Sequence, residues 1–274
     1  MPARKTRILL ANDDGIDAPG IQALYHELKA HFEVTVVAPM HEKSGAGCSL
    51  SLSAEMEVDE RHDHGKVWGY AVNGTPADCV KFAMVALNGY RPDLVLSGIN
   101  RGTNLGNSVF YSGTVAAAIE GTLYGLPAMA CSLACWGHPE AFYGDAAKVV
   151  RQLVPWLLSF QHEPRTLWNI NFPNKRYDEL GPIRFTSQGT SFYEDTFELY
   201  RQDGVQRYYR NVGAELKACQ VKPDADDRAV AEGDISLSLL RTDLTIPIPN
   251  AAARALETEC NALLRHPRNH AGHR

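Results

Sequence analysis

Strand-like and helix-like segments alternate along residues 1–173 of the chain, and this alternation constrains the fold more than any other feature. Short runs of apolar and β-branched residues, such as Arg7–Ala11, Glu33–Ala38 and Asp93–Ser97, are typical of buried strands. Between the first two runs, the apolar residues of Gly20–Phe32 recur at helical spacing. Because crossover helices join parallel strands, the pattern predicts an α/β fold with a mostly parallel sheet covered by helices on both faces.

Further elements of this region follow from the same periodicity. Strict alternation of apolar residues predicts a strand at Leu50–Val58, with Lys66–Val72 as its hairpin neighbour across the loop RHDHG. The segment Thr75–Asp78 is a capping box with proline at the first helical position, and it predicts a helix that runs to about Leu87. The remaining predicted elements are helices at Thr114–Tyr124 and Glu140–Phe160, and strands at Pro127–Leu133 and Leu167–Phe172.

The chain changes character after Pro173. Strand-like segments without helices between them follow at Ile183–Thr196, Val205–Val212 and Ile235–Leu240. Asp203-Gly204 is a hairpin turn signal, and a last helix is predicted at Ala251–Leu264. We therefore expect residues 1–173 to form one α/β domain. Residues 174–274 are expected to form an antiparallel extension with a terminal helix, not an independent domain, that packs on the first domain or on another subunit.

Charge and cysteine usage exclude several classes of protein. The 274 residues carry a formal net charge of −5, which argues against a surface that wraps a nucleic-acid polymer. No apolar run approaches the roughly 18–20 residues of a membrane span. The run after the basic N-terminus, Ile8–Asn12, is too short for a secretory signal. Scattered cysteines without CxxC pairs favour reduced, buried thiols and a cytoplasmic location. These cysteines are Cys48, Cys79, Cys131, Cys135, Cys219 and Cys260.

Two adjacent carboxylates, Asp13 and Asp14, follow directly after the first predicted strand. In open α/β sheets, ligands bind beyond the carboxyl ends of the strands. A divalent cation such as Mg²⁺ or Mn²⁺ would remove the repulsion between the two carboxylates and take their oxygens as ligands. The alternative is a turn or a helix N-cap, because Asp and Asn favour both.

Two later loops also follow predicted strands and are expected at the same edge of the sheet. In the first, the hydroxyl of Ser44 could reach a metal, although the loop lacks the Walker pattern. In the second, Asn100 offers a neutral oxygen ligand. Ser112–Thr114 lie where a helix begins, so their backbone N–H groups could bind an anion or the side chains could simply cap the helix. Together the three loops suggest metal-assisted transfer of a phosphoryl group to water, with Asp13 or Asp14 as the general base.

Five motifs in a fixed order carry a resemblance to a known family. They read LLANDDGIDAPGI, VVAPMHEKSGAGCSLSL, AVNGTPADCV, LVLSGINRGTNLGNSVFYSGTVAAAIEG and NINFP. They resemble the SurE family of 5′-nucleotidases, also called survival proteins, closely over Arg7–Pro173 and more weakly to about Thr245. The resemblance implies a Rossmann-like, three-layer α/β/α catalytic domain that hydrolyses nucleoside monophosphates with a divalent cation. It also implies a homodimer or homotetramer that forms through the C-terminal extension.

The resemblance also implies roles for individual residues. The family's metal ligands fall on Asp13, Asp14, Ser44 and Asn100, which would hold one Mg²⁺ or Mn²⁺ per subunit. Its phosphate-binding residues fall on Asn104, Ser112, Gly113 and Thr114, and its pocket wall on Asn73, Gly74 and Thr75. The segment Gly233–Leu240 departs from the family pattern GYxSxTPL, which bears on the oligomer more than on the active site.

Several alternatives remain open beside a metal-dependent 5′-nucleotidase. The same site could serve a broad-specificity acid-type phosphatase, a short-chain polyphosphatase or a non-catalytic nucleotide sensor. A phosphatase with a covalent aspartyl intermediate is disfavoured, because such enzymes usually carry Asp-x-Asp. His62 and His64 have the spacing of a transition-metal pair, but a solvated hairpin loop is favoured because no third ligand is evident. The aromatic tract Phe192–Tyr209 is acidic as well, which favours a subunit-contact arm.

Overall fold

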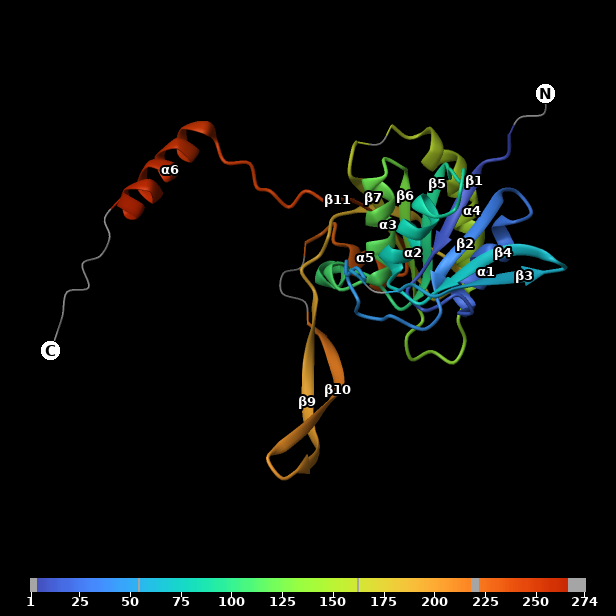
Figure 1. The fold of residues 1–274 in the computed structure, drawn as a ribbon, viewed down its shortest axis with the longest axis horizontal. Coiled ribbons are helices and arrows are strands. Elements are labelled where there is room, and N and C mark those ends of the chain that lie inside the picture. Colours follow the sequence, from blue (N-terminus) through green and yellow to red (C-terminus); the bar gives the residue numbers. More distant parts are fainter. Residues whose placement is uncertain (1–3, 54, 162, 218–221, 266–274) are drawn as a thin grey trace. The chain divides into compact units, whose positions relative to one another are not determined.

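The computed structural model describes residues 4–53, 55–161, 163–217 and 222–265. The chain divides into two compact units, Met1–Thr242 and Asp243–Arg274. The first unit contains a central sheet with helices on both sides, and the second contains the helix α6, Asn250–Arg265 (Figure 1). The α/β fold predicted from the alternation of strands and helices is confirmed. The boundary expected after residue 173 stays a prediction.

The sheet consists of nine strands in the order β3-β4-β2-β1-β5-β6-β7-β11-β8. Its six central strands are mutually parallel, as predicted. They are β1 (Arg7–Ala11), β2 (Glu33–Pro39), β4 (Lys66–Val72), β5 (Leu94–Arg101), β6 (Ala128–Ala134) and β7 (Thr166–Pro173). The antiparallel strands lie at the two sides: β3 (Val58–Asp63) pairs with β4, and β11 (Ile235–Arg241) pairs with β7.

Both faces of the sheet are buried, which explains why its central strands read as continuous apolar runs. Along β1, Ile8 and Leu10 lie in the core with α1 (Pro19–Leu28) and α4 (Tyr143–Ser159). Leu9 and Ala11 point to the opposite face, with α2 (Pro76–Val85) and α3 (Gly113–Leu123). Burying a single leucine or isoleucine contributes about 1.5–3 kcal/mol, so this register is strongly specified.

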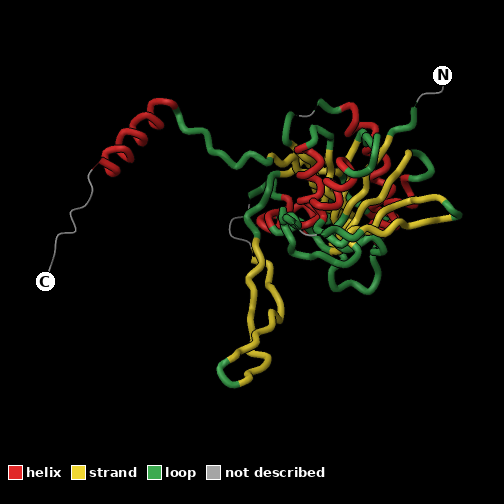
Figure 2. Tube along the Cα trace, in the orientation of Figure 1, coloured by secondary structure: helices red, strands yellow, loops and turns green. Residues whose placement is uncertain are grey.

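The C-terminal part of the first unit is divided between the sheet and a separate hairpin. The strands β8 (Ile183–Thr186) and β11 extend the sheet beyond β7. The strands β9 (Phe192–Asp203) and β10 (Gln206–Lys217) form a two-stranded antiparallel ribbon (Figure 2). The turn between them falls at the predicted Asp203-Gly204 signal. A short helix, α5 (Asp226–Ala231), precedes β11. The prediction that no helix interrupts these strands was therefore wrong.

The predicted strand at Leu50–Val58 was also wrong. The described residues 50–53 and 55–57 are irregular, and β3 begins only at Val58. The alternating side chains do not face a core, because Leu52 is 81% exposed and Met56 is 37% exposed. The predicted loop RHDHG lies mostly in the hairpin: His62 belongs to β3, and the turn falls at His64-Gly65.

The cysteine prediction holds for three residues. Cys79, Cys131 and Cys135 are buried free thiols, whereas Cys48 and Cys260 are exposed. Cys219 lies outside the described residues. Among the helices in the described ranges, none combines the length and the apolar character needed to cross a membrane.

Two short 3₁₀ helices complete the first unit. The helix η1 (Gly106–Phe110) lies in the connection between β5 and α3, and η2 (Tyr177–Glu179) follows β7. The connection from β5 to α3 contains two of the four residues that the sequence assigns to a phosphate site, Asn104 and Ser112.

Candidate active site

The loops predicted to carry chemistry meet at one edge of the sheet. They follow β1, β2, β4 and β5, which are parallel neighbours, so their carboxyl ends lie together. Backbone hydrogen bonds join the loops: the Lys43 N–H donates to the Asp13 carbonyl (2.7 Å), and the Gly47 N–H donates to the Tyr111 carbonyl (3.0 Å). The predicted convergence of segments far apart in the sequence is therefore observed.

Asp13 is buried against the start of α3. The Thr114 hydroxyl donates to its Oδ1 atom, and the backbone N–H groups of Gly113 and Thr114 lower the pKa of the carboxyl. Burial is the larger effect, so the pKa of Asp13 is raised above its usual value. A Cβ atom at position 113 would lie 2.7 Å from the Asp13 Cβ and 2.9 Å from the Pro76 Cγ. Only glycine allows the helix to approach the carboxylate this closely.

Asp14 is half-buried and receives the backbone N–H of Arg101 at 2.9 Å. Burial, followed by repulsion from Asp13 and a smaller contribution from Glu42, raises the pKa of Asp14 to about 6. Two neighbouring carboxylates therefore both resist ionisation. A cation bound between them would favour the ionised forms, and this electrostatic need is the first reason to regard the pair as a metal site.

Ser44 and Asn100 are the residues predicted to supply neutral oxygens to the metal site. Ser44 Oγ donates to Glu42 Oε1 at 2.6 Å. The negative charge of Glu42 also contributes to the raised pKa of Asp14. Asn100 Nδ2 donates to the Gly102 carbonyl at 3.0 Å, which leaves the amide oxygen as the ligand atom. In residues 4–265 as described, no group of three or more His, Cys, Asp and Glu side chains is placed to hold a metal ion. The predicted donor set is instead two carboxylates with hydroxyl and amide oxygens, a hard set of the kind that suits Mg²⁺ or Mn²⁺.

Three of the residues predicted to bind phosphate lie at the start of α3, and Asn104 lies in the loop after β5. Ser112 is the N-cap of α3, and its Oγ accepts from the Val115 N–H at 3.0 Å, so the capping alternative is confirmed. The first N–H groups of the helix, those of Gly113 and Thr114, face the Asp13 carboxylate, so phosphate binding by these residues stays a prediction. Asn104 is buried in the loop after β5: its Nδ2 donates to Ser132 Oγ at 2.8 Å, and its carbonyl accepts from Asn169 Nδ2 at 2.8 Å. Its role in phosphate binding stays a prediction.

The predicted pocket wall begins at the carboxyl end of β4. Thr75 caps α2 in the expected capping box, and its hydroxyl donates to the Ser49 carbonyl at 2.8 Å. Gly74 is buried and Asn73 is exposed. The close approach of Pro76 to Gly113 links this segment to the start of α3. Pro76, the next residue, therefore lies near Asp13, and contact of the three predicted residues with a substrate stays a prediction.

Sequence reasoning missed several residues of the site. Glu42 and Arg101 lie one or two positions from predicted ligands, so their proximity in the sequence was an available signal. With Asp14 and Tyr143 they line a cavity of about 350 Å³. Tyr143 comes from α4, and no local pattern links it to this edge.

Asp226 was missed as well, and it stabilises the loop that leads to α3. It is buried in α5, and its carboxylate accepts the N–H groups of Gly106 and Gly189, both at 3.0 Å. Because these contacts cross 120 and 37 positions of the chain, no spacing in the sequence indicates them.

The fold and this edge define a class of protein: a Rossmann-like α/β/α protein with an acidic site at the carboxyl ends of its parallel strands. The family model described as Survival protein SurE matches residues 8–195. A relative named 5′-nucleotidase SurE from Carboxydothermus hydrogenoformans is 42% identical over 242 residues, with 87% of this chain and 91% of the relative covered. This chain belongs to the SurE family.

Two further comparisons agree with that assignment. A relative from Heliobacterium modesticaldum, also named 5′-nucleotidase SurE, is 40% identical over 244 residues and is aligned over 87% of each chain. The crystal structure of the SurE protein from Aquifex aeolicus superposes with a TM-score of 0.77 at 37% sequence identity. The superposition covers 92% of this chain and 99% of the Aquifex aeolicus chain. The predicted family and the three-layer fold are thereby confirmed.

Proposed function

We propose that this chain is a metal-dependent 5′-nucleotidase that hydrolyses nucleoside monophosphates to nucleoside and phosphate. The observation that carries the proposal is the pair Asp13 and Asp14 directly after β1, with Asp13 held against the N-terminal end of α3 and Asp14 against the end of β5. Carboxylates next to a helix N-terminus combine a cation site with an anion site, as the hydrolysis of a phosphate ester requires. The names of the relatives, 5′-nucleotidase SurE, support the same activity.

One divalent cation, Mg²⁺ or Mn²⁺, would be held in each subunit by Asp13, Asp14, Ser44 and Asn100. When bound, such a cation polarises a phosphoryl oxygen and lowers the pKa of a water molecule. The donor set fits this role, because it offers only oxygen ligands and its two carboxylates repel each other without a cation.

The chain's own residues would bind the phosphate and transfer protons. The N–H groups at the start of α3, in Ser112–Thr114, would bind the phosphate, and the helix dipole favours its negative charge. Asp14 is better placed than Asp13 to accept the proton of the attacking water. Asp14 lines the 350 Å³ cavity, whereas Oδ1 of Asp13 already accepts from Thr114. The water oxygen would form a bond to phosphorus as the bond from phosphorus to the nucleoside oxygen breaks, and the proton that Asp14 accepted would pass to that nucleoside oxygen.

The chain is further proposed to act in the cytoplasm as a homodimer or homotetramer. Buried free thiols such as Cys79 and Cys131 suit a reducing compartment. The hairpin of β9 and β10 exposes aromatic side chains, including Phe197 and Tyr200, each 63% exposed, as an arm that contacts another subunit would. No nucleic-acid polymer is proposed as a partner, because the chain carries a net charge of −5.

Phosphate release from a panel of substrates tests the proposal. The panel contains nucleoside 5′- and 3′-monophosphates, short polyphosphates and a simple aryl phosphate, each with Mg²⁺, with Mn²⁺ and with EDTA. Cation-dependent release that favours the 5′-nucleotides is expected. Equal release from every ester would indicate a broad-specificity phosphatase, and nucleotide binding without release would indicate a sensor. Release that survives EDTA would contradict the metal-dependent mechanism.

A further inference from the structure

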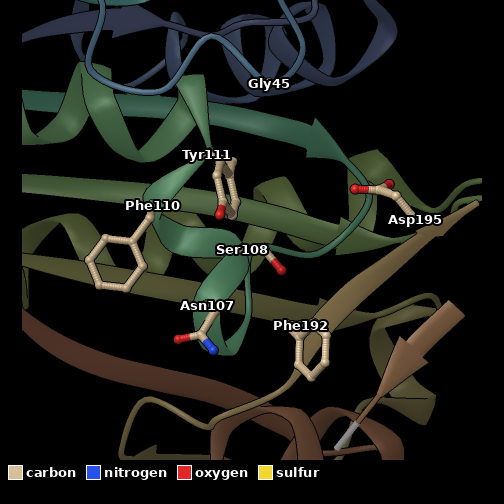
Figure 3. Close-up of a pocket in the computed structure, with 7 residues that line it drawn as sticks. All are labelled: Gly45, Asn107, Ser108, Phe110, Tyr111, Phe192 and Asp195. Atoms are coloured by element: carbon tan, nitrogen blue, oxygen red, sulfur yellow. The ribbon is translucent and has the colours of Figure 1, made fainter. Parts of the chain in front are cut away.

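A second cavity, of about 670 Å³, lies between the loop after β2, the helix η1 and the start of β9. Its lining includes Gly45, Ser108, Phe110, Tyr111, Phe192 and Asp195 (Figure 3). The volume is in the range of small-molecule sites, about 300–1,000 Å³. The residues that carry the predicted chemistry do not line it, so it requires its own explanation.

The position of this cavity relates it to the carboxylate pair. Gly45 follows Ser44, and Tyr111 precedes Ser112, so the cavity begins one residue from a predicted metal ligand and one residue from the N-cap of α3. The hydrogen bond from the Gly47 N–H to the Tyr111 carbonyl, at 3.0 Å, holds the two walls together. A substrate with its phosphate at the start of α3 therefore has this cavity as adjacent space for the rest of the molecule.

The side chains in the cavity have the chemistry of a base-binding site. Tyr111 is 67% exposed and Phe192 is 37% exposed, so both rings offer faces on which a planar base can stack. In Figure 3 the Tyr111 ring and Phe192 lie on either side of Ser108, and Asp195 faces them from β9. Asp195 Oδ1 accepts from Asn211 Nδ2 of β10 at 2.7 Å, which orients the carboxylate. A carboxylate only accepts hydrogen bonds, so it selects a partner that presents N–H donors.

We propose that this cavity binds the nucleoside of the substrate, with the base against Tyr111 and Phe192 and its N–H donors on Asp195. The inference rests on the proposed 5′-nucleotidase function, and it adds a preference for guanine. Guanine presents an imino and an amino N–H side by side, which matches a carboxylate. Adenine presents a ring nitrogen acceptor beside its amino group, which a carboxylate repels.

Binding of guanosine, which has no phosphate, tests the cavity independently of catalysis. Equilibrium binding is measured by calorimetry for the wild-type chain and for Tyr111→Ala, with Tyr111→Phe to preserve the stacking ring. Tyr177→Ala, a substitution of a partly exposed tyrosine that does not line this cavity, is the matched control. Loss of the ring should weaken guanosine binding by about 5- to 150-fold, the equivalent of about 1–3 kcal/mol per stacked base. Tyr111→Phe and Tyr177→Ala should bind as the wild type does.

Turnover of two substrates distinguishes a failure of the inference about the cavity from a failure of the proposed 5′-nucleotidase function. For guanosine 5′-monophosphate, Tyr111→Ala should raise KM by a similar factor, while ribose 5-phosphate, which lacks a base, should be hydrolysed as by the wild type. Phosphate release with guanosine binding that does not depend on Tyr111 would overturn the inference and leave the 5′-nucleotidase function intact. Guanosine binding that depends on Tyr111 without phosphate release would support the cavity and overturn the function. Equal loss on both substrates would show that Tyr111 is only structural, which also overturns the inference.

The role of Asp195 has its own test. Asp195→Asn should reduce the ratio of guanosine to adenosine affinity at least about tenfold, because a hydrogen bond to a charged group is replaced by one to a neutral amide. Asp203→Asn, at the far end of the same strand, is the control and should leave the ratio unchanged. An unchanged ratio in Asp195→Asn would refute the guanine preference.

Discussion

Replacement of Asp14 by asparagine should stabilise the cation-free protein, and by more as the pH rises. In the folded chain, burial and the neighbouring Asp13 raise the pKa of Asp14 from 3.8 to about 6. The folded state therefore holds the proton more tightly than the unfolded state. Below about pH 4 both states are protonated, and Asp14 costs no stability. Between about pH 4 and pH 6 the unfolded state releases its proton first, so the free energy of unfolding falls and stays lower above pH 6.

The size of this effect follows from the shift. A change of one pKa unit corresponds to about 1.4 kcal/mol, so the raised pKa of Asp14 costs about 3 kcal/mol at pH 7. For a chain of this size, about 2 °C in Tm per kcal/mol gives a difference of about 6 °C. A bound divalent cation reverses the sign, because it interacts with the ionised carboxylate and stabilises only the folded state.

Thermal unfolding of wild type and Asp14→Asn in EDTA, from pH 4 to pH 8, measures the effect. The Tm difference should be near zero at pH 4 and should reach about 6 °C in favour of Asp14→Asn at pH 7. Addition of Mn²⁺ should raise the Tm of the wild type and not that of the variant. Asp17→Asn, whose side chain is 75% exposed, is the control. A Tm difference that is the same at pH 4 and pH 7 would refute the reasoning.

Three further substitutions test the architecture around the site. Gly113→Ala places a Cβ atom 2.7 Å from that of Asp13, which should cost about 1–3 kcal/mol of stability and reduce phosphate release at least about tenfold. Stability is measured by urea titration and phosphate release by a turnover assay. Gly144→Ala, where a Cβ atom meets open space, is the control and should change neither stability nor turnover. Asp226→Ala leaves two buried N–H groups unpaired and should lower the free energy of unfolding by about 1–3 kcal/mol for each. An unchanged urea midpoint would contradict the stabilising role of Asp226. Thr75→Ala removes the N-cap of α2 and should cost about 1 kcal/mol in the same titration, and a cost near zero would contradict the cap.

Local patterns predicted the parts of the fold whose physics is local. The strand Arg7–Ala11 was predicted with its observed bounds, because both of its faces are buried and every residue after Arg7 is apolar. The capping box at Thr75 was confirmed because it needs only the residues of one helical turn. The alternation at Leu50–Val58 predicted a strand that is not observed, because periodicity indicates burial only where a core lies against one face of the segment. Leu52 is 81% exposed.

The site was predictable where its residues lie at or just after strand ends, as Asn100 does near the end of β5, and not where it depends on tertiary contacts. Parallel strands bring Asp13, Ser44 and Asn100 to one edge, and this could be inferred from the order of the elements alone. Asn104 lies in the expected loop, yet its partners come from β6 and β7, which no spacing in the sequence reveals. Asp226 could not be predicted for the same reason, because it accepts from the N–H group of Gly106, 120 positions away in the chain.

The most direct test of the central claim is phosphate release from nucleoside 5′-monophosphates by Asp13→Asn at saturating Mn²⁺, compared with the wild type. Asp13 is buried against the start of α3 and is assigned both to the cation and to the edge where the phosphate binds. The account predicts a loss of turnover of about a hundredfold or more, with the folded state retained. Turnover by Asp13→Asn at the wild-type rate would contradict it.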